Sequence, residues 1–345
     1  MVGLAVAFVA AGCIGDDETD EVDDRLEELA GGQPGIASLA ATTTEYAPYF
    51  YAFSWGDSRF PFTSLVDMRA RSGLSSVTLA FVYDDGGCRV NTDIQRNRTD
   101  LNAFRNGGGT VKAAFGGVPG RYLEVMCRDD ETLASAIGAF VDATGIRDLT
   151  FEVNEEVAPI EVVNVRRARA LKRVQDSRRI KVSFTLPVAP RDVNGTPGGL
   201  SSTSLGVLRA ALDAGVTISH VNLLTMDFDP ALVGGRSMSE LAISALEDTA
   251  TQMQELIPGL SRARAFAMLG ATPMIGVNDI STQVFGLQDA ARLVAFARSK
   301  HLGLLSFWAI NRDQPCARGE LPPWTCSGVN VTTFEFHRAF AAVRR

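Results

Sequence analysis

From residue 46 onward, short runs rich in β-branched and aromatic residues alternate with longer amphipathic stretches. The short runs predict strands at 46–53, 77–82, 110–115, 148–153, 181–186, 218–226, 265–270 and 304–309. The stretches between them have helical spacing and predict helices at 63–71, 93–106, 130–143, 161–176, 202–214, 238–256, 287–299 and 332–344. Capping residues support these boundaries, since Asp129 precedes one helix and Gly145 follows it.

Eight consecutive strand–helix pairs predict an α/β fold, the (β/α)₈ TIM barrel, over residues 46–345. An open, doubly wound sheet is the alternative. Such a sheet normally has a glycine-rich phosphate loop after its first strand, and Ser54-Trp55-Gly56-Asp57 is not one. The barrel is therefore the favoured architecture.

The N-terminal part of the chain has a different composition. Residues 2–12 are apolar, too short to span a bilayer, and typical of an export signal. The Ala-Ala-Gly before Cys13 resembles the bacterial lipobox, in which the cysteine is lipidated. We therefore expect a lipoprotein signal at 1–13 and a flexible acidic tether at 14–45. A short buried helix is the alternative.

Charge is concentrated in the predicted tether. Residues 16–30 hold nine acids and one arginine, a net charge of −8, so the rest of the chain carries −7 + 8 = +1. A nearly neutral domain argues against nucleic acid as a partner. Membrane association is expected only through the lipid. The three histidines have no ligand spacing, so we expect no metal and no cofactor.

Five cysteines fit one acylated residue, Cys13, and two disulfides. Cys88 and Cys127 follow consecutive predicted strands, and Cys316 and Cys326 close a short loop. Both bridges are plausible in an exported protein. Four free, buried thiols in a cytoplasmic protein are the alternative.

In a barrel, function lies in the loops at the carboxyl ends of the strands. At those ends the chain places tryptophan, other aromatic residues, amides and carboxylates, among them Trp55, Asp227, Trp308 and Asn311. Aromatic faces stack on sugar rings and carboxylates bind hydroxyl groups, so this combination is typical of a carbohydrate site.

Several stretches resemble the bacterial chitinases of glycoside hydrolase family 18. They occur in the family's order over nearly all of residues 46–345 and include YAPYF, AAFGG, DLTFEVN, VNLLTMDF, GATPMIGVND and LLSFWAINRD. The resemblance implies the barrel fold and a substrate of β-1,4-linked N-acetylglucosamine. It also implies substrate-assisted hydrolysis with retention, in which a glutamate of an Asp-x-Asp-x-Glu motif on the fourth strand is acid and base.

The chain departs from that motif. Thr150 and Glu152 take the two Asp places, and Asn154 takes the place of the catalytic Glu. An amide is neither an acid nor a base at neutral pH, so both halves of the reaction lose their proton carrier. Glu156 also points inward if the strand continues, and it is a weaker candidate for the acid. Glu155 is expected on the opposite face, at the rim or the start of the helix.

Other positions match the family more closely. The resemblance assigns Asp227 and Met226 to the acetamide-binding region, where Phe228 replaces a tyrosine. It assigns sugar contacts to the remaining matched positions, which are Tyr49, Gly116, Gly117, Thr150 and Trp308.

Three hypotheses follow. The first is a monomeric, exported chitin-binding protein with lost or strongly reduced hydrolysis. The second is an active chitinase or N-acetylglucosaminidase that uses Glu152 or Glu156. The third is an interaction scaffold without a sugar site.

Overall fold

The computed structural model describes residues 44–117, 120–317 and 324–344. The predicted lipidation site Cys13, the predicted signal and most of the predicted tether lie outside these residues. Within them the main sheet has the strand order β1-β11-β8-β7-β6-β5-β4-β3-β2, with every pairing parallel. The strands are β1 (Glu45–Tyr46), β2 (Tyr49–Tyr51), β3 (Ser76–Val82), β4 (Thr110–Gly116), β5 (Asp148–Glu152), β6 (Lys181–Pro187), β7 (Ile218–Leu224), β8 (Leu269–Thr272) and β11 (Leu304–Leu305).

The two ends of this order are the two halves of the first predicted strand. β1 pairs with β11, and β2 pairs with β3. Pro48, which has no N–H to donate, lies between the halves, while its carbonyl accepts a hydrogen bond from Thr78 N at 2.9 Å. The sheet therefore closes into a barrel, which confirms the predicted fold class.

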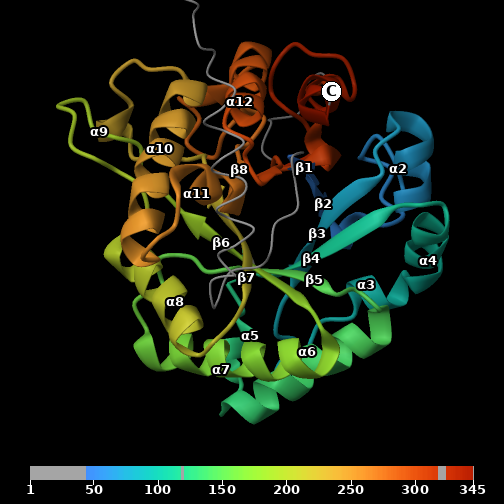
Figure 1. Ribbon diagram of the computed structural model, residues 1–345. Helices are drawn as coiled ribbons and strands as arrows, with labels where there is room; N and C mark the ends of the chain where they lie inside the picture. Colours follow the sequence, from blue (N-terminus) through green and yellow to red (C-terminus); the bar gives the residue numbers. More distant parts are fainter. Residues whose placement is uncertain (1–43, 118–119, 318–323, 345) are drawn as a thin grey trace, which may run out of the picture.

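Helices surround the barrel (Figure 1). They are α2 (Leu65–Ser72), α3 (Asp93–Arg96), α4 (Arg98–Asn106), α5 (Leu123–Met126), α6 (Asp130–Thr144), α7 (Glu161–Arg178), α8 (Ser202–Asp213), α9 (Pro230–Val233), α10 (Met238–Leu256), α11 (Arg262–Met268), α12 (Leu287–Ser299) and α13 (Glu335–Phe340). Short 3₁₀ helices occupy Ala52–Ser54, Ile310–Arg312 and Ala341–Arg344, and a hairpin joins β9 (Gly276–Val277) to β10 (Val284–Phe285). None of the helices in the described part of the chain is long and apolar enough to cross a membrane.

One predicted strand is wrong in its position. Residues 265–270 were expected to be extended, but α11 covers most of them and β8 begins only at Leu269. The Ser261 hydroxyl accepts a hydrogen bond from Arg264 N at 3.2 Å and caps this helix. The apolar run was too short for its composition to distinguish a buried helix from a strand.

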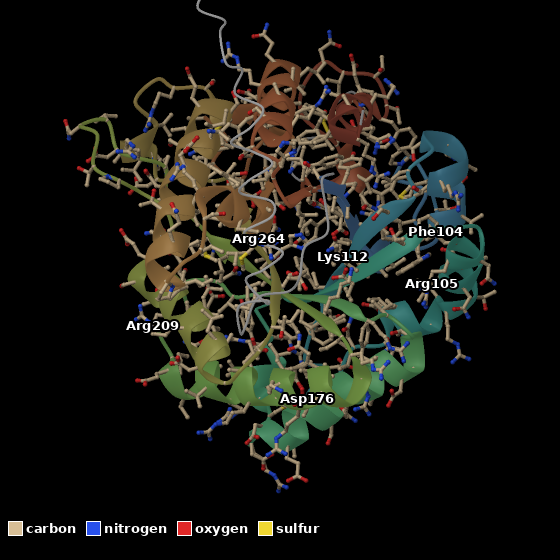
Figure 2. The ribbon with its side chains drawn as sticks, viewed as in Figure 1. Phe104, Arg105, Lys112, Asp176, Arg209 and Arg264 are labelled. Carbon is tan, nitrogen blue, oxygen red and sulfur yellow. A yellow bond between two sulfur atoms is a disulfide. The ribbon has the colours of Figure 1, made fainter. Side chains whose placement is uncertain are left out.

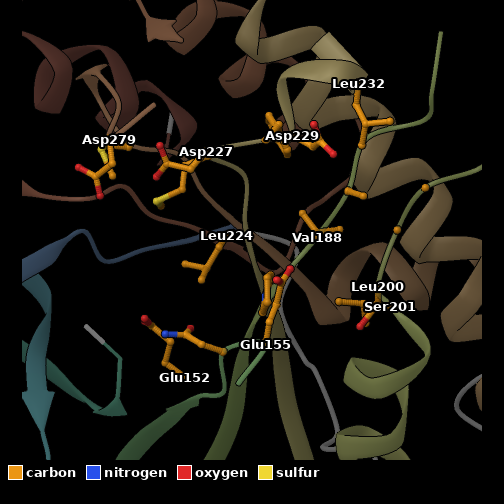
Figure 3. Close-up of a pocket in the computed structure, with 18 of the residues that line it drawn as sticks. Glu152, Glu155, Val188, Leu200, Ser201, Leu224, Asp227, Asp229, Leu232 and Asp279 are labelled. Carbon is orange, nitrogen blue, oxygen red and sulfur yellow. The ribbon is translucent and has the colours of Figure 1, made fainter. Parts of the chain in front are cut away.

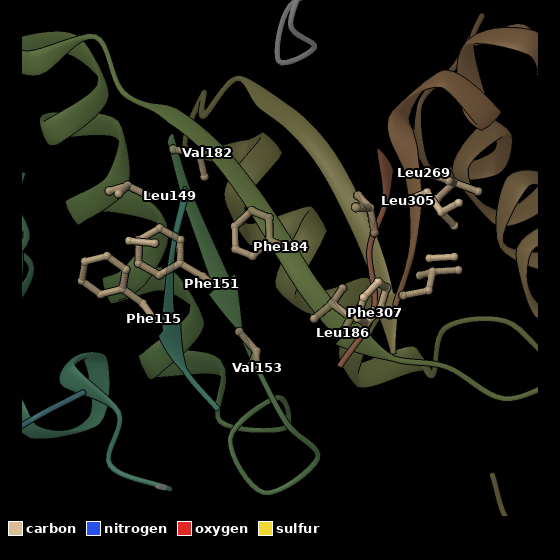
Figure 4. Close-up of a cluster of buried hydrophobic side chains, with 14 of the residues drawn as sticks. Phe115, Leu149, Phe151, Val153, Val182, Phe184, Leu186, Leu269, Leu305 and Phe307 are labelled. Atoms are coloured by element: carbon tan, nitrogen blue, oxygen red, sulfur yellow. The ribbon is translucent and has the colours of Figure 1, made fainter. Parts of the chain in front are cut away.

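The packed core lies between the sheet and the helices. Phe115, Phe151 and Phe184 project from neighbouring strands into this layer (Figure 4), and the Phe115 and Phe151 rings stack 5.0 Å apart. Val153 belongs to the same core. Residues that alternate with these, such as Thr150, therefore face the interior of the barrel.

Two features hold the barrel ends. At the amino ends of the strands, buried Lys112 on β4 (Figure 2) forms ion pairs with Glu45 at 3.0 Å and Asp148 at 3.3 Å. At the carboxyl ends, Cys88–Cys127 and Cys316–Cys326 are disulfides, as predicted. These bridges fix loops close to the rim where a barrel carries its chemistry.

Candidate functional site

A cavity of about 670 Å³ lies at the carboxyl ends of the strands. Residues following β5, β6, β7, β8 and β11 contribute to its walls (Figure 3). The lining residues are Phe81, Glu152, Asn154, Glu155, Pro187, Val188, Ala189, Pro197, Gly198, Gly199, Leu200, Ser201, Leu224, Met226, Asp227, Phe228, Asp229, Leu232, Met274, Asp279 and Trp308.

Glu152, the last residue of β5, lies at the inner end of the cavity and is only 5% exposed. Burial raises the pKa of its carboxyl from 4.5 to about 8. At neutral pH the group is therefore mostly protonated. It can donate a hydrogen bond to a carbonyl oxygen in the cavity, which an ionised carboxylate cannot do.

The raised pKa predicts a pH-dependent stability. Between about pH 4.5 and pH 8 the folded protein keeps a proton that the unfolded chain releases, so Glu152 makes folding less favourable as pH rises. Glu152→Gln keeps the neutral shape without that loss. We expect its stability advantage over the unaltered protein to grow by up to about 1.4 kcal/mol per pH unit in this window.

Urea unfolding across the window measures this difference. Asp313, whose pKa burial raises to about 7, adds a similar slope to both proteins and cancels in the comparison. Parallel stability curves for the two proteins would contradict the assignment.

Asn154 follows β5 and lines the cavity, half-buried. Its main-chain carbonyl accepts hydrogen bonds from Val157 N at 3.1 Å and Ala158 N at 3.0 Å, which turn the chain out of the sheet. Its side-chain amide has no hydrogen-bond partner within residues 44–117, 120–317 and 324–344. The amide is therefore free to bind a ligand, but it carries no ionisable proton.

This turn also separates the next two acids. Glu155 is exposed and lines the cavity (Figure 3), so it lies at the rim as predicted, but the prediction that it lies on the opposite face is wrong. Glu156 does not line it; its carboxylate accepts a hydrogen bond from the Tyr122 hydroxyl at 3.3 Å in a separate recess. The strand does not continue, so alternation with period two ceases at Asn154.

The opposite wall comes from the segment after β7. Asp227 has a left-handed backbone (φ 48°), and its carboxylate accepts a hydrogen bond from Ile280 N at 2.9 Å. Burial raises the pKa of this carboxyl above its ordinary value. Met226 and Phe228 flank it and also line the cavity, and the Phe228 ring is buried. The Asp227 carboxyl group thus lies between two apolar side chains in this wall.

Trp308 forms an aromatic floor. Its ring lies 5.4 Å from Phe81, nearly parallel to it, and 4.9 Å from Tyr51. Tyr49 packs beneath Trp308 at 5.4 Å, and its hydroxyl hydrogen-bonds to Thr185. Trp308 therefore faces the cavity, while Tyr49 supports it from below and does not line it.

Three further predicted residues also lie outside the cavity lining. Thr150 hydrogen-bonds to Thr185 at 2.8 Å inside the barrel. Gly116 and Gly117 have positive φ values of 90° and 72°. A Cβ at Gly116 would approach the Glu152 carbonyl oxygen to 2.5 Å, so glycine is needed there for close packing of neighbouring chain segments.

The sequence did not point to the outer walls of the cavity. Val188 and Leu200 line it from the segment between β6 and α8, and Leu232 lines it from α9. Among the described residues, no group of three or more His, Cys, Asp or Glu side chains is placed to hold a metal ion.

Comparison with known proteins identifies the relatives. Endochitinase 11 of Metarhizium anisopliae is 30% identical over 291 residues, 79% of this chain and 53% of that protein. The catalytic domain of a hyperthermophilic chitinase from Pyrococcus furiosus is 29% identical, with a TM-score of 0.75 over 90% of this chain and 96% of that domain. The chain is a chitinase-like member of glycoside hydrolase family 18.

A second curated relative is a probable bifunctional chitinase/lysozyme of Escherichia coli, 29% identical over 292 residues, 78% of this chain and 31% of that protein. The family 18 chain thus spans about half or less of the curated relatives it matches. A family GH18 chitinase from Chromobacterium violaceum shares the fold at 13% identity, with a TM-score of 0.57. No model of a known protein family matches the chain.

Proposed function

We propose that this family 18 barrel binds β-1,4-linked N-acetylglucosamine polymers and has lost, or strongly reduced, the ability to hydrolyse them. The proposal rests on Asn154, an amide that lines the cavity and that the sequence resemblance aligns with the family's catalytic glutamate. The chitinase names of its relatives support the choice of polymer.

The cavity supports sugar binding. The Trp308 ring, lined from below by Tyr49 and Tyr51, offers an apolar face to one pyranose ring. Protonated Glu152 can donate to the acetamide oxygen, and the Asp227 carboxylate can accept from a hydroxyl or the acetamide N–H. These groups hold an acetylated sugar without breaking a bond.

The proposed site lacks two groups that hydrolysis needs, a general acid–base group and a hydroxyl group that holds the acetamide. General acid–base catalysis contributes about 10²- to 10⁴-fold, and the Asn154 amide supplies none of it. Phe228 has no hydroxyl to steady the acetamide group during its attack on the anomeric carbon. Binding and bond cleavage are therefore separable in this site.

A second candidate function has one observation in its favour. Glu152 carries a proton at neutral pH and lies in the same cavity, so it can act as a general acid in slow hydrolysis. Glu156 has no such support, because it lines a different recess. Turnover that disappears in Glu152→Gln and persists in Glu156→Gln would favour this candidate.

A pull-down on insoluble chitin with the purified full chain tests binding. A sensitive assay of oligomer cleavage on the same preparation tests hydrolysis. Binding without cleavage supports the proposal, whereas robust cleavage, or no retention on chitin, contradicts it.

Trp308→Ala provides a quantitative test of the sugar floor. A buried aromatic anchor contributes about 2 kcal/mol or more to a complex, so we expect at least about 30-fold weaker binding of N-acetylglucosamine oligomers. Trp308→Phe, which keeps an aromatic face, should lose less. Calorimetry gives the affinities, and a melting curve for each variant verifies that the barrel remains folded. Equal affinity in all three proteins would contradict the assignment.

We also propose that the protein acts as an exported monomer, lipidated at Cys13 and held off the envelope by the acidic tether at 14–45. The apolar stretch before Cys13 and the two disulfides support this location. Incorporation of a labelled fatty acid that Cys13→Ser abolishes tests the anchor.

A further inference from the structure

The ionisable side chains described in the cavity lining are all acidic. Among the described residues that line it, five are acidic and none is Lys, Arg or His. The acids are Glu152, Glu155, Asp227, Asp229 and Asp279. In Figure 3, the three aspartates lie along one side and the two glutamates along the other. A ligand in the cavity therefore has carboxyl groups on both flanks.

These acids differ in whether the protein donates hydrogen bonds to their carboxyl groups. Asp227 accepts a hydrogen bond from Ile280 N, and Asp229 accepts one from Ala231 N at 2.9 Å. Glu152 is 95% buried, faces the cavity and has no hydrogen-bond partner within the described ranges. Glu155 and Asp279 are exposed at the rim, and their side chains have no hydrogen bond to the described residues. The last three are available to a ligand.

One cation lies behind this wall and does not reach the cavity. Arg312 is fully buried, donates to the Val277 carbonyl at 2.6 Å, and is close enough to Asp227 and Asp279 to interact with both. It offsets part of the negative charge at the aspartate side.

We propose that the cavity selects polymers in which some of the sugars carry a free amino group, and that it discriminates against sugars that carry a carboxylate. The preferred ligand is a partially deacetylated N-acetylglucosamine polymer. The disfavoured one is a glycan containing lactyl-substituted sugars, whose carboxylate repels Glu155 and Asp279. This inference rests on the proposed sugar-binding function and narrows its ligand.

The selection follows from simple electrostatics. A protonated sugar amine beside Glu155 or Asp279 is attracted to the carboxylate, whereas a sugar carboxylate at the same place is repelled by it. Exposed pairs of this kind change affinity by about 2- to 5-fold each. Between an amine-containing and a carboxylate-containing oligomer, two such rim contacts predict a ratio of dissociation constants of about tenfold. Salt reduces that ratio, because the rim is open to solvent.

The test measures the affinity of the full chain for three oligomers of equal length. The first is fully acetylated, the second contains glucosamine, and the third contains N-acetylmuramic acid. Titration calorimetry at slightly acidic pH keeps the amine protonated. We expect the glucosamine oligomer to bind most tightly and the muramic acid oligomer most weakly, with the differences shrinking at high salt.

Two variants locate the effect. Glu155→Gln and Asp279→Asn should each reduce the ratio between the glucosamine and muramic acid oligomers by about 2- to 5-fold. Glu131→Gln, on the exposed face of α6 and outside the cavity, is the matched control and should leave the ratio unchanged.

The possible outcomes distinguish failure of the proposed sugar-binding function from failure of the proposed charge selection. If no oligomer binds, the proposed function fails. If the acetylated oligomer binds and the other two bind equally well, the function stands and the charge selection is wrong. A ratio that is present but unaffected by both rim variants also contradicts this assignment.

Discussion

Asn154→Glu is expected to raise the cleavage of N-acetylglucosamine oligomers by about 10²- to 10⁴-fold, the usual contribution of a general acid–base group. The side chain at this position already lines the same cavity as Trp308 and has no competing hydrogen bond in the described structure. Glutamate there regains a group that can protonate the leaving oxygen and then activate water. Release of reducing ends measures the gain.

Asn154→Gln is the matched control, because it lengthens the side chain equally without adding an acid. We expect it to remain inactive. If Asn154→Glu is inactive as well, Phe228→Tyr and Glu152→Asp should be added, since the sequence resemblance predicts tyrosine and aspartate at these two positions. A triple variant without activity, yet still bound to chitin, would show that the site has diverged beyond the loss of one proton carrier.

Much of the fold was predictable from the chain because its elements repeat a single unit. The alternation of apolar runs and amphipathic stretches predicted the barrel, and Asp129 and Gly145 predicted the two ends of α6. The structure shows Thr132 N donating to Asp129 at 2.8 Å and a left-handed Gly145. The region before β8 was mispredicted, since residues 265–268 are equally compatible with a buried strand or a buried helix.

The directions of site side chains were predictable only for residues that lie within a strand. Alternation correctly directed Thr150 into the barrel and Phe151 outward, because both lie within β5. It failed for Glu155, since the two hydrogen bonds to the Asn154 carbonyl turn the chain just before it. No sequence pattern specifies the direction of a side chain once the chain leaves a strand, so the cavity walls had to come from the structure.

The loop that carries Asn154 and Glu155 is connected by hydrogen bonds to a buried ion pair on the outer side of the barrel. Arg167 of α7 donates to the Glu124 carboxylate at 2.6 Å, and both side chains are almost inaccessible. Arg167 also donates to the Asn164 side chain at 2.9 Å, and Asn164 in turn donates to the Ala158 carbonyl at 2.8 Å. The pair thus supports the far end of the turn that begins at Asn154.

Breaking this pair from one side should be costly. Glu124→Leu leaves the Arg167 guanidinium buried without its counter-charge, so we expect the free energy of unfolding to fall by about 3–5 kcal/mol. Glu124→Leu combined with Arg167→Met removes both charges and should recover most of that loss, because well-packed apolar residues often replace a buried pair at little cost. Urea unfolding of the three proteins measures both effects.

The same variants connect stability to the sugar site. In the double variant the barrel is stable, but Asn164 has lost its partner and holds Ala158 less firmly. We therefore expect oligomer affinity to fall even though the fold is recovered. Unchanged affinity in the double variant would mean that the turn keeps Asn154 and Glu155 in place through its own main-chain hydrogen bonds, and that the ion pair serves stability alone.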